Sequence, residues 1–173
     1  MKKIIFACIL LISTSALAQT PTYLTSKDSV DGGIIFNGPI TFEDLNSELT
    51  FTWLMQANEY KPYDKIVDYL KTYLPDYTMI VFMGTWCDDS HYLIPRLERV
   101  LQLTNYPASK LTMYGVDRAK NTKNGEDKKY GITLVPTIIL FKDGKEIGRI
   151  TESVKKSIEE DLAAIITYPP QGH

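Results

Sequence analysis

The sequence predicts an α/β domain, and three features indicate this class. Five consecutive apolar residues at 79–83 lie between Pro75 and Gly84 and have the length and β-branched content of a strand buried on both faces. An amphipathic pattern typical of a long helix follows and runs through Leu103. Farther along, an Asp-Gly turn joins two short strands into a hairpin. Strands that alternate with helical segments are typical of a sheet covered by helices.

Residues 1–18 have the order of a Sec-type secretory signal peptide. Two lysines precede an apolar run over 4–12, and small residues ending at Ala18 provide a cleavage site. We therefore expect a periplasmic or secreted mature protein. A lipoprotein signal through Cys8 is a poorer match because only four apolar residues precede that cysteine. No other apolar run approaches the roughly 20 residues of a membrane-spanning helix, so no membrane association is expected after cleavage.

The charge and the cysteine count of the mature chain exclude some classes of function. Cleavage leaves 155 of the 173 residues, enough for one domain with a sizeable core. Two of the 19 basic residues leave with the signal, so 17 remain against 21 acidic ones, and no nucleic-acid partner is expected. Cys8 also leaves, so Cys87 cannot form an internal disulfide. An unpaired thiol in an exported chain indicates chemistry between molecules.

The stretch between the signal peptide and the first helix is expected to hold little structure. Residues 19–33 are polar and rich in turn formers, with a short strand expected at 33–36 and a turn at 37–39. The chain then divides into four parts: signal peptide 1–18, leader or linker 19–38, domain 39–168 and flexible tail 169–173.

Two helices are expected before the buried strand. Thr41 and Asp44 resemble a capping box that opens a helix running to about Tyr60. Trp53 falls on the apolar spacing of that helix and is interpreted as a packing residue rather than as part of a ligand site. Pro62 suits the first turn of a second helix with one apolar and one charged face.

Further elements follow the long helix. The expected order is a strand at 110–116, an exposed loop at 119–128 leading into a short helical turn, a strand at 138–141, its hairpin partner at 146–150 and a closing helix at 154–166.

Cys87 is the expected nucleophile. It stands where the buried strand hands over to the long helix, among backbone N–H groups that favour a thiolate. Asp88 and Asp89 oppose the thiolate by like charge but interact favourably with the same helix end. His91 lies four residues on and would favour the thiolate if protonated; alternatively it is an exposed polar residue of the first turn.

In this order, several motifs resemble the thioredoxin-like family over roughly residues 77–166. They are the apolar strand, Trp86-Cys87, Pro95 inside the helix, Val116-Asp117, Tyr130-Gly131-Ile132, Val135-Pro136-Thr137 and a Lys-Asp-Gly hairpin. The resemblance implies a three-layer α/β/α fold with a mixed central sheet, here with an N-terminal helical extension. It also implies a cis peptide bond at Val135-Pro136 beside the cysteine, and docking of substrate backbone at Val135, Pro136 and Thr137.

Two residues depart from the family's oxidoreductases, whose motif is Trp-Cys-x-x-Cys. Ser90 stands in place of the second cysteine, and a hydroxyl cannot expel a substrate from a mixed disulfide at a useful rate. Val81 stands in place of a buried carboxylate that helps to deprotonate that second thiol. A complete dithiol cycle within this molecule is therefore excluded.

Arg118 is a further candidate for the site. In the implied fold, the strand before it ends on the same edge of the sheet as Cys87, so its guanidinium could stabilise a thiolate or a substrate carboxylate. The alternative is a surface arginine paired with Asp117 or Asp88.

Three functions fit this site, and none requires a metal or a cofactor. The favoured one is a monothiol redox protein: the Cys87 thiolate attacks a disulfide or an oxidised cysteine of a protein or small molecule, and an external thiol resolves the adduct. The second is a binding module that holds extended peptides between Trp86 and Pro136 without turnover. The third, a one-cysteine peroxidase, is weakest because the Pro-x-x-x-Thr-x-x-Cys arrangement of peroxiredoxins is missing, although Thr85 is close.

Overall fold

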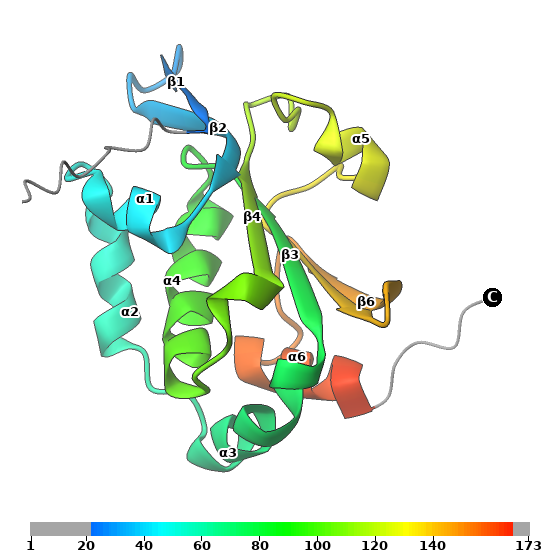
Figure 1. The fold of residues 1–173 in the computed structure, drawn as a ribbon. Helices are drawn as coiled ribbons and strands as arrows, with labels where there is room; N and C mark the ends of the chain where they lie inside the picture. Colours follow the sequence, from blue (N-terminus) through cyan, green and yellow to red (C-terminus); the bar gives the residue numbers. More distant parts are fainter. Residues whose placement is uncertain (1–21, 168–173) are drawn as a thin grey trace, which may run out of the picture.

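The computed structural model describes residues 22–167 (Figure 1), so the expected signal peptide and the tail at 169–173 lie outside the described residues. Six strands form one mixed sheet in the order β1-β2-β4-β3-β5-β6. The strands are β1 (Leu24–Lys27), β2 (Ile34–Ile40), β3 (Thr78–Met83), β4 (Leu111–Gly115), β5 (Thr137–Lys142) and β6 (Lys145–Thr151). β3 and β4 are parallel, and the other four neighbouring pairs are antiparallel.

Six α-helices accompany the sheet in the described part of the chain. They are α1 (Phe42–Ser47), α2 (Gln56–Glu59), α3 (Asp64–Tyr73), α4 (Asp88–Leu103), α5 (Glu126–Tyr130) and α6 (Ile158–Thr167), with 3-10 turns at Thr52–Met55, Leu74–Asp76 and Ala108–Lys110. The helix after Pro62, the long helix, the hairpin and the closing helix are confirmed, with ends shifted by a few residues.

β3 is buried on both faces, as its continuous apolar run predicts. Val81 and Met83 point into the larger core, whereas Phe82, between them, belongs to a second cluster with Val116 and Ile139. Successive residues of a strand face opposite sides of the sheet, so one strand supplies both layers of packing. The α/β class and the mixed thioredoxin-like sheet are confirmed.

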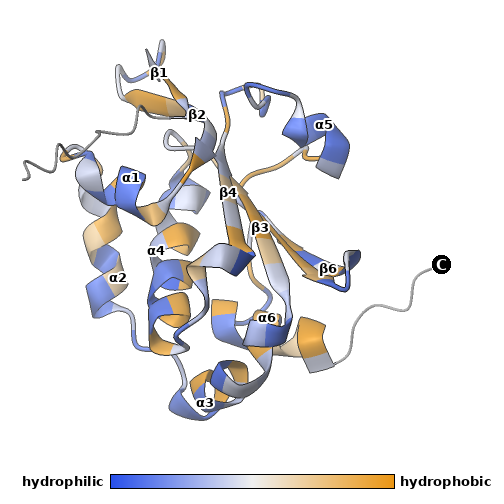
Figure 2. Ribbon diagram, in the orientation of Figure 1, coloured by the Kyte–Doolittle hydropathy of each residue, from blue (hydrophilic) through white to orange (hydrophobic). Residues whose placement is uncertain are grey.

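The two faces of the sheet are covered unequally. The larger core contains buried residues of α1, α3, α4 and α6, such as Leu45, Leu70, Ile94 and Leu162. The smaller core is covered by α5, whose Tyr130 packs against it, and by the loops on either side of α5. Figure 2 shows α5 as largely hydrophilic and α4 as a mixture of apolar and polar stretches. The site described below lies where the strand ends meet the first turn of α4.

The prediction that residues 19–33 hold little structure is wrong for the part described. β1 pairs antiparallel with β2 from Leu24↔Asn37 to Lys27↔Ile34. Residues 37–39, expected to turn, belong to β2, and Gly38 pairs with Gly115. Turn-forming composition is a local signal, and pairing with β4, about 75 residues away in the chain, overrides it here. The short strand expected at 33–36 is confirmed as the start of β2, and the segment called a leader supplies β1 and most of β2.

The single helix expected from Thr41 to Tyr60 is interrupted. The Thr41–Asp44 capping box is present, but α1 ends at Ser47 and helical structure resumes only at Thr52. The side chains of Asn46 and Ser47 bond to carbonyls one turn back, which competes with continuation of the helix. Leu49 lies in this interruption and is 89% exposed.

Candidate active site

Cys87 is the N-cap residue of α4. Its backbone is extended, and its carbonyl accepts the first helical bond from His91 N–H at 2.9 Å. The half-buried thiol donates to Val135 O at 3.3 Å, and the Val135–Pro136 peptide bond is cis. The fold thus brings the cysteine and the residues before β5 together, 48 positions apart in the sequence. Because only the protonated thiol can donate, ionisation of Cys87 releases this contact with Val135.

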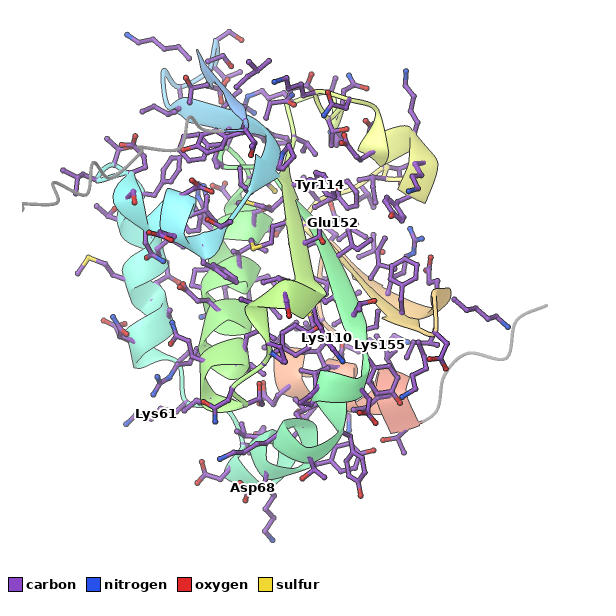
Figure 3. The ribbon with its side chains drawn as sticks, in the orientation of Figure 1. Lys61, Asp68, Lys110, Tyr114, Glu152 and Lys155 are labelled. Carbon is purple, nitrogen blue, oxygen red and sulfur yellow. The ribbon has the colours of Figure 1, made fainter. Side chains whose placement is uncertain are left out.

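Two hydrogen bonds hold Pro136 and Thr137 in place where the preceding loop meets β5. Thr137 Oγ1 donates to Leu134 O at 2.7 Å, and Pro136 O accepts from Glu152 N–H at 2.7 Å. Glu152 has a positive φ of 63° and lies toward the upper end of the sheet in Figure 3, as Tyr114 does. These contacts hold the loop that faces Cys87 in one position.

Ser90 is fully buried, and its hydroxyl accepts a hydrogen bond from Gly84 N–H at 3.2 Å. The bond satisfies a backbone donor in the turn between β3 and α4. Asp88 and Asp89, on the same helical turn, are both exposed. Ser90 therefore ties the turn together, and the two carboxylates face solvent.

Trp86 lies across the end of the sheet. Its indole Nε1–H donates to Val116 O at 2.9 Å, and the ring is half-buried. A Cβ on Gly84 would lie 2.7 Å from the Trp86 ring, so only glycine allows the ring to lie this close to the turn. The ring is thereby held beside Cys87.

Arg118 pairs with a residue that the sequence analysis did not consider. Its Nε lies 2.7 and 2.8 Å from the two carboxylate oxygens of Asp28, and its guanidinium lies 5.0 Å from the Trp86 ring. The Arg118 hydrogen bonds hold the pKa of the Asp28 carboxyl below its usual range. Asp28 falls in the segment expected to be a leader and carries no local signal of this role. Arg118 is held by Asp28 rather than by Asp117 or Asp88.

His91 is half-buried rather than an exposed polar residue. Its Nε2 lies 2.7 Å from Thr85 O, and a carbonyl can only accept, so this nitrogen carries the proton. Nδ1 lies 3.8 Å from the exposed Asp88 carboxylate. The ring stacks on Trp53 with centroids 4.5 Å apart and an interplanar angle of 19°. Trp53 is a packing residue, as expected, and what it packs against is the active-site turn.

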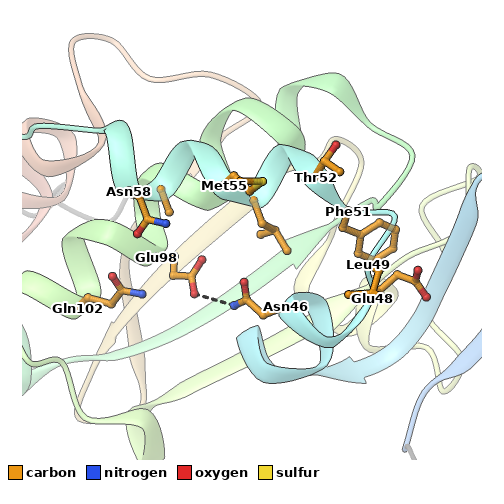
Figure 4. A pocket seen from close by; sticks show the side chains of 11 residues that line it. Asn46, Glu48, Leu49, Phe51, Thr52, Met55, Asn58, Glu98 and Gln102 are labelled. Atoms are coloured by element: carbon orange, nitrogen blue, oxygen red, sulfur yellow. Dashed lines mark hydrogen bonds between the residues drawn. The ribbon is translucent and has the colours of Figure 1, made fainter.

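A separate pocket of about 350 Å³ lies between the N-terminal helices and α4 (Figure 4). Glu98, 7% exposed, lines it and accepts from Asn46 Nδ2 at 2.9 Å. Burial raises the pKa of the Glu98 carboxyl, and the Asn46 bond partly opposes this. Glu98 is eleven residues beyond Cys87 on the same helix, or about 16 Å along its axis, so this pocket does not belong to the cysteine site.

Two features are absent from the described residues. Residues 22–167 contain no group of three or more His, Cys, Asp or Glu side chains placed to hold a metal ion. Over the same range, no helix is both long and apolar enough to cross a membrane.

The chain is similar to known proteins in sequence and in fold. A family model described as "Thioredoxin" matches residues 59–167. The chain is 32% identical over 89 residues to "Thioredoxin" of Chlamydia muridarum, an alignment covering 51% of this chain and 78% of that protein. It is 26% identical over 86 residues to "Thioredoxin-1" of Saccharomyces cerevisiae, covering 50% and 78%. A crystal structure of a protein of unknown function from Pseudomonas aeruginosa is similar in fold, with a TM-score of 0.52 at 14% identity over 76% of this chain and 82% of that one.

Proposed function

Because the chain belongs to the thioredoxin family, we propose that it is an exported redox protein in which Cys87 alone carries out thiol–disulfide exchange. The observation that carries this proposal is the contact between Cys87 Sγ and Val135 O, beside the cis Pro136. The Cys87 thiol thus lies at the N-terminus of α4, next to a backbone segment against which an extended substrate could lie. Cys87 is the one cysteine among residues 22–167, and Cys8 would leave with the proposed signal peptide, so the partner thiol would come from another molecule.

The exchange proceeds in two displacements. The Cys87 thiolate attacks one sulfur of a disulfide, a Cys87–substrate disulfide forms, and the other sulfur leaves as a thiolate that takes up a proton. An external thiolate then attacks the substrate sulfur of this adduct. A disulfide forms between the external thiol and the substrate, and Cys87 is released with its electron pair. Electrons thus pass from the external thiol to the substrate, and Cys87 ends as it began.

Because Ser90 cannot resolve the adduct, the second displacement requires an external thiol. Its hydroxyl is buried and accepts from Gly84 N–H, and a hydroxyl is a far poorer nucleophile toward sulfur than a thiolate. A neighbouring thiol would act at a high effective concentration, whereas an external thiol acts in proportion to its concentration. The Cys87 adduct should therefore persist when no other thiol is present.

A binding module without turnover is the second candidate. The fixed position of Trp86, whose indole Nε1–H donates to Val116 O at 2.9 Å, favours it, because a ring held in place offers a contact surface to a peptide. In that case extended peptides would lie beside Trp86 and Pro136 without forming a covalent bond.

Incubation with oxidised insulin or a model disulfide peptide tests the two candidates. The wild type should form adducts, visible on non-reducing gels and by intact mass, that an added thiol releases at a rate proportional to its concentration. Cys87→Ser should form none, and Ser90→Ala serves as the matched control that keeps Cys87. Ser90→Cys should gain some dithiol activity, limited by the apolar Val81. Rapid turnover by the wild type without an added thiol would exclude the monothiol mechanism, and absence of any adduct would leave the binding module.

The proposal of export rests on residues 1–18 of the sequence. The mature protein should begin at Gln19 and be recovered from the periplasm or the medium. Intact-mass measurement of the exported protein tests this, and retention of residues 1–18 or a lipid on Cys8 would contradict it.

A further inference from the structure

A small pocket opens on the side of Trp86 that faces the N-terminal segment. We call it the aromatic pocket; its volume is about 210 Å³, and its walls include Asp31, Ile34, Phe51, Trp53, Trp86 and His91. Pockets that hold whole drug-sized ligands or cofactors usually measure about 300–1,000 Å³. The aromatic pocket is therefore of a size for a single side chain.

Four aromatic rings dominate its walls. Trp53 stacks on His91 at 4.5 Å and contacts Phe51 with ring centroids 5.6 Å apart. Trp86 is fixed by its bond to Val116 O, and His91 by its contact with Thr85 O. Rings held in this way present their faces without further ordering, and the faces of indole and benzene rings attract cations.

The charges around the pocket are mainly negative. Asp31 contributes a carboxylate whose side chain is 58% exposed, and Asp88 and Asp89 lie exposed on the first turn of α4. The nearest cation, Arg118, is matched by Asp28 at hydrogen-bond distance and lies 3.6 Å from Asp31. A second cation, Lys120, has its Nζ 5.6 Å from the centre of the Trp86 ring. Asp28, Asp31, Asp88 and Asp89 outnumber these two cations, so the surroundings favour a positively charged occupant.

The aromatic pocket adjoins the reacting cysteine. Trp86 is the neighbour of Cys87 in sequence, and His91 N–H bonds to Cys87 O at 2.9 Å. Cys87 itself does not line the pocket, so a side chain of a polypeptide joined to Cys87 would enter it past Trp86.

We propose that the aromatic pocket binds a lysine or arginine side chain close to the reacting cysteine of a partner polypeptide. This inference rests on the proposed exchange at Cys87 and names its substrate class: disulfides in basic surroundings. The ammonium or guanidinium group lies against the rings of Trp53 and Trp86 and near the Asp31 carboxylate, and the aliphatic stem contacts Ile34. A cation–π contact together with an ion pair gives selectivity without a new catalytic group.

Peptides that differ at one position test the proposal. Each carries one cysteine as a mixed disulfide with a chromogenic thiol, and the residue beside it is lysine, arginine, leucine or glutamate. We expect the second-order rate of adduct formation with Cys87 to be about tenfold higher for lysine and arginine than for glutamate, with leucine between them. Added salt should shrink this difference.

Variants assign the preference to the pocket. Asp31→Asn keeps the oxygen that accepts from Gly33 N–H but removes the charge, and it should lose most of the preference. Trp53→Leu should reduce it, and Trp53→Phe, which restores a ring, should regain part of it. Asp68→Asn is the matched control: Asp68 is exposed on α3, at the lower end of the molecule in Figure 3, and its removal should leave the preference intact.

Two outcomes separate failure of this inference from failure of the redox proposal. Equal rates for all four peptides, or fastest reaction with leucine, would overturn the basic-side-chain inference while leaving exchange at Cys87 in place. If no peptide forms an adduct, binding of the corresponding serine peptides to Cys87→Ser is measured by calorimetry. Tighter binding of the lysine peptide than of the glutamate peptide, lost in Asp31→Asn, would support the pocket alone. Equal or undetectable binding would overturn it.

Discussion

Asp28 and Arg118 lie 90 positions apart in the sequence and are joined by two hydrogen bonds of 2.7 and 2.8 Å from Arg118 Nε. Asp28 is 3% exposed, and its backbone closes the turn between β1 and β2 through Asp28 N–H to Gly33 O at 2.7 Å. The pair therefore fastens the N-terminal hairpin to the loop after β4. Arg118 in turn lies over the face of Trp86.

This pair should make stability depend on pH in the acid range. The pKa of Asp28 is lowered in the folded protein, chiefly by Arg118, from an ordinary value of 3.8. The folded state thus binds this proton less tightly than the unfolded state, so the contribution is fully present above pH 3.8 and is lost as pH falls through the folded value. Urea unfolding from pH 7 to pH 2 should show that Asp28→Asn is less stable than the wild type at pH 7. The difference should shrink as the pH falls below 3.8. Asp68→Asn is the control, and a constant difference across this range would contradict the assignment.

The stacked pair Trp53 and His91 should contribute to stability beyond the area it buries. A double-mutant cycle with Trp53→Leu and His91→Ala should give a coupling energy of about 0.5–1.5 kcal/mol, as offset aromatic pairs do. The cycle cancels the separate loss of the His91–Thr85 contact. A second cycle that pairs Trp53→Leu with Tyr92→Ala, an exposed neighbour on α4, should give less than about 0.5 kcal/mol. Equal couplings in both cycles would mean that the stack contributes nothing specific.

Glu98 should destabilise the fold at neutral pH. Burial raises its pKa, so the folded state binds the proton more tightly than the unfolded state, and stability falls as pH rises above the ordinary value of 4.5. Glu98→Gln keeps an oxygen for Asn46 without a charge. It should raise the free energy of unfolding at pH 7 by about 1.4 kcal/mol for each unit by which the pKa is raised, with the gain shrinking toward pH 4.5. Glu59→Gln, at an exposed site, should change little. A gain that does not vary with pH would point to packing instead.

Gly115 should be irreplaceable where β2 meets β4. A Cβ at this position would lie 2.3 Å from Phe36 O, a backbone atom of the paired strand. Gly115→Ala should therefore lower the free energy of unfolding by about 3 kcal/mol or more, because the two strands must separate to admit the methyl group. Gly125→Ala is the comparison: nothing lies within 4 Å, but φ is +83°, so a loss of about 1–2 kcal/mol is expected from backbone strain alone. Similar losses for both variants would mean that β2 and β4 tolerate separation.

Local patterns predicted the elements whose packing is set nearby in the sequence. The apolar run of β3, the periodicity of α4 and the Asp-Gly turn of the hairpin each carry their own signal, and the structure confirms all three. β1 carries no such signal, and in β2 only the start, the strand expected at 33–36, does. What makes Asn37-Gly38-Pro39 a strand is a partner strand about 75 residues away. Dependence on long-range contacts also explains which residues of the candidate site could not be predicted from the sequence. The role of Cys87 can be predicted from its position between a strand and a helix. Asp28 and Trp53 join the site only through contacts with Arg118 and His91, which lie 90 and 38 positions away in the sequence.

The pairing of β2 with β4 also determines how far the chain can be truncated without exposing the edge of the sheet. The family match begins at residue 59, after both β1 and β2 have been completed. A fragment limited to residues 59–167 would leave the outer edge of β4 open, with a row of unpaired N–H and C=O groups. Such an edge accepts strands from other molecules, so this fragment should aggregate where the longer chain does not. The boundary of family similarity is therefore not the boundary of the folding unit, which extends back at least to Leu24.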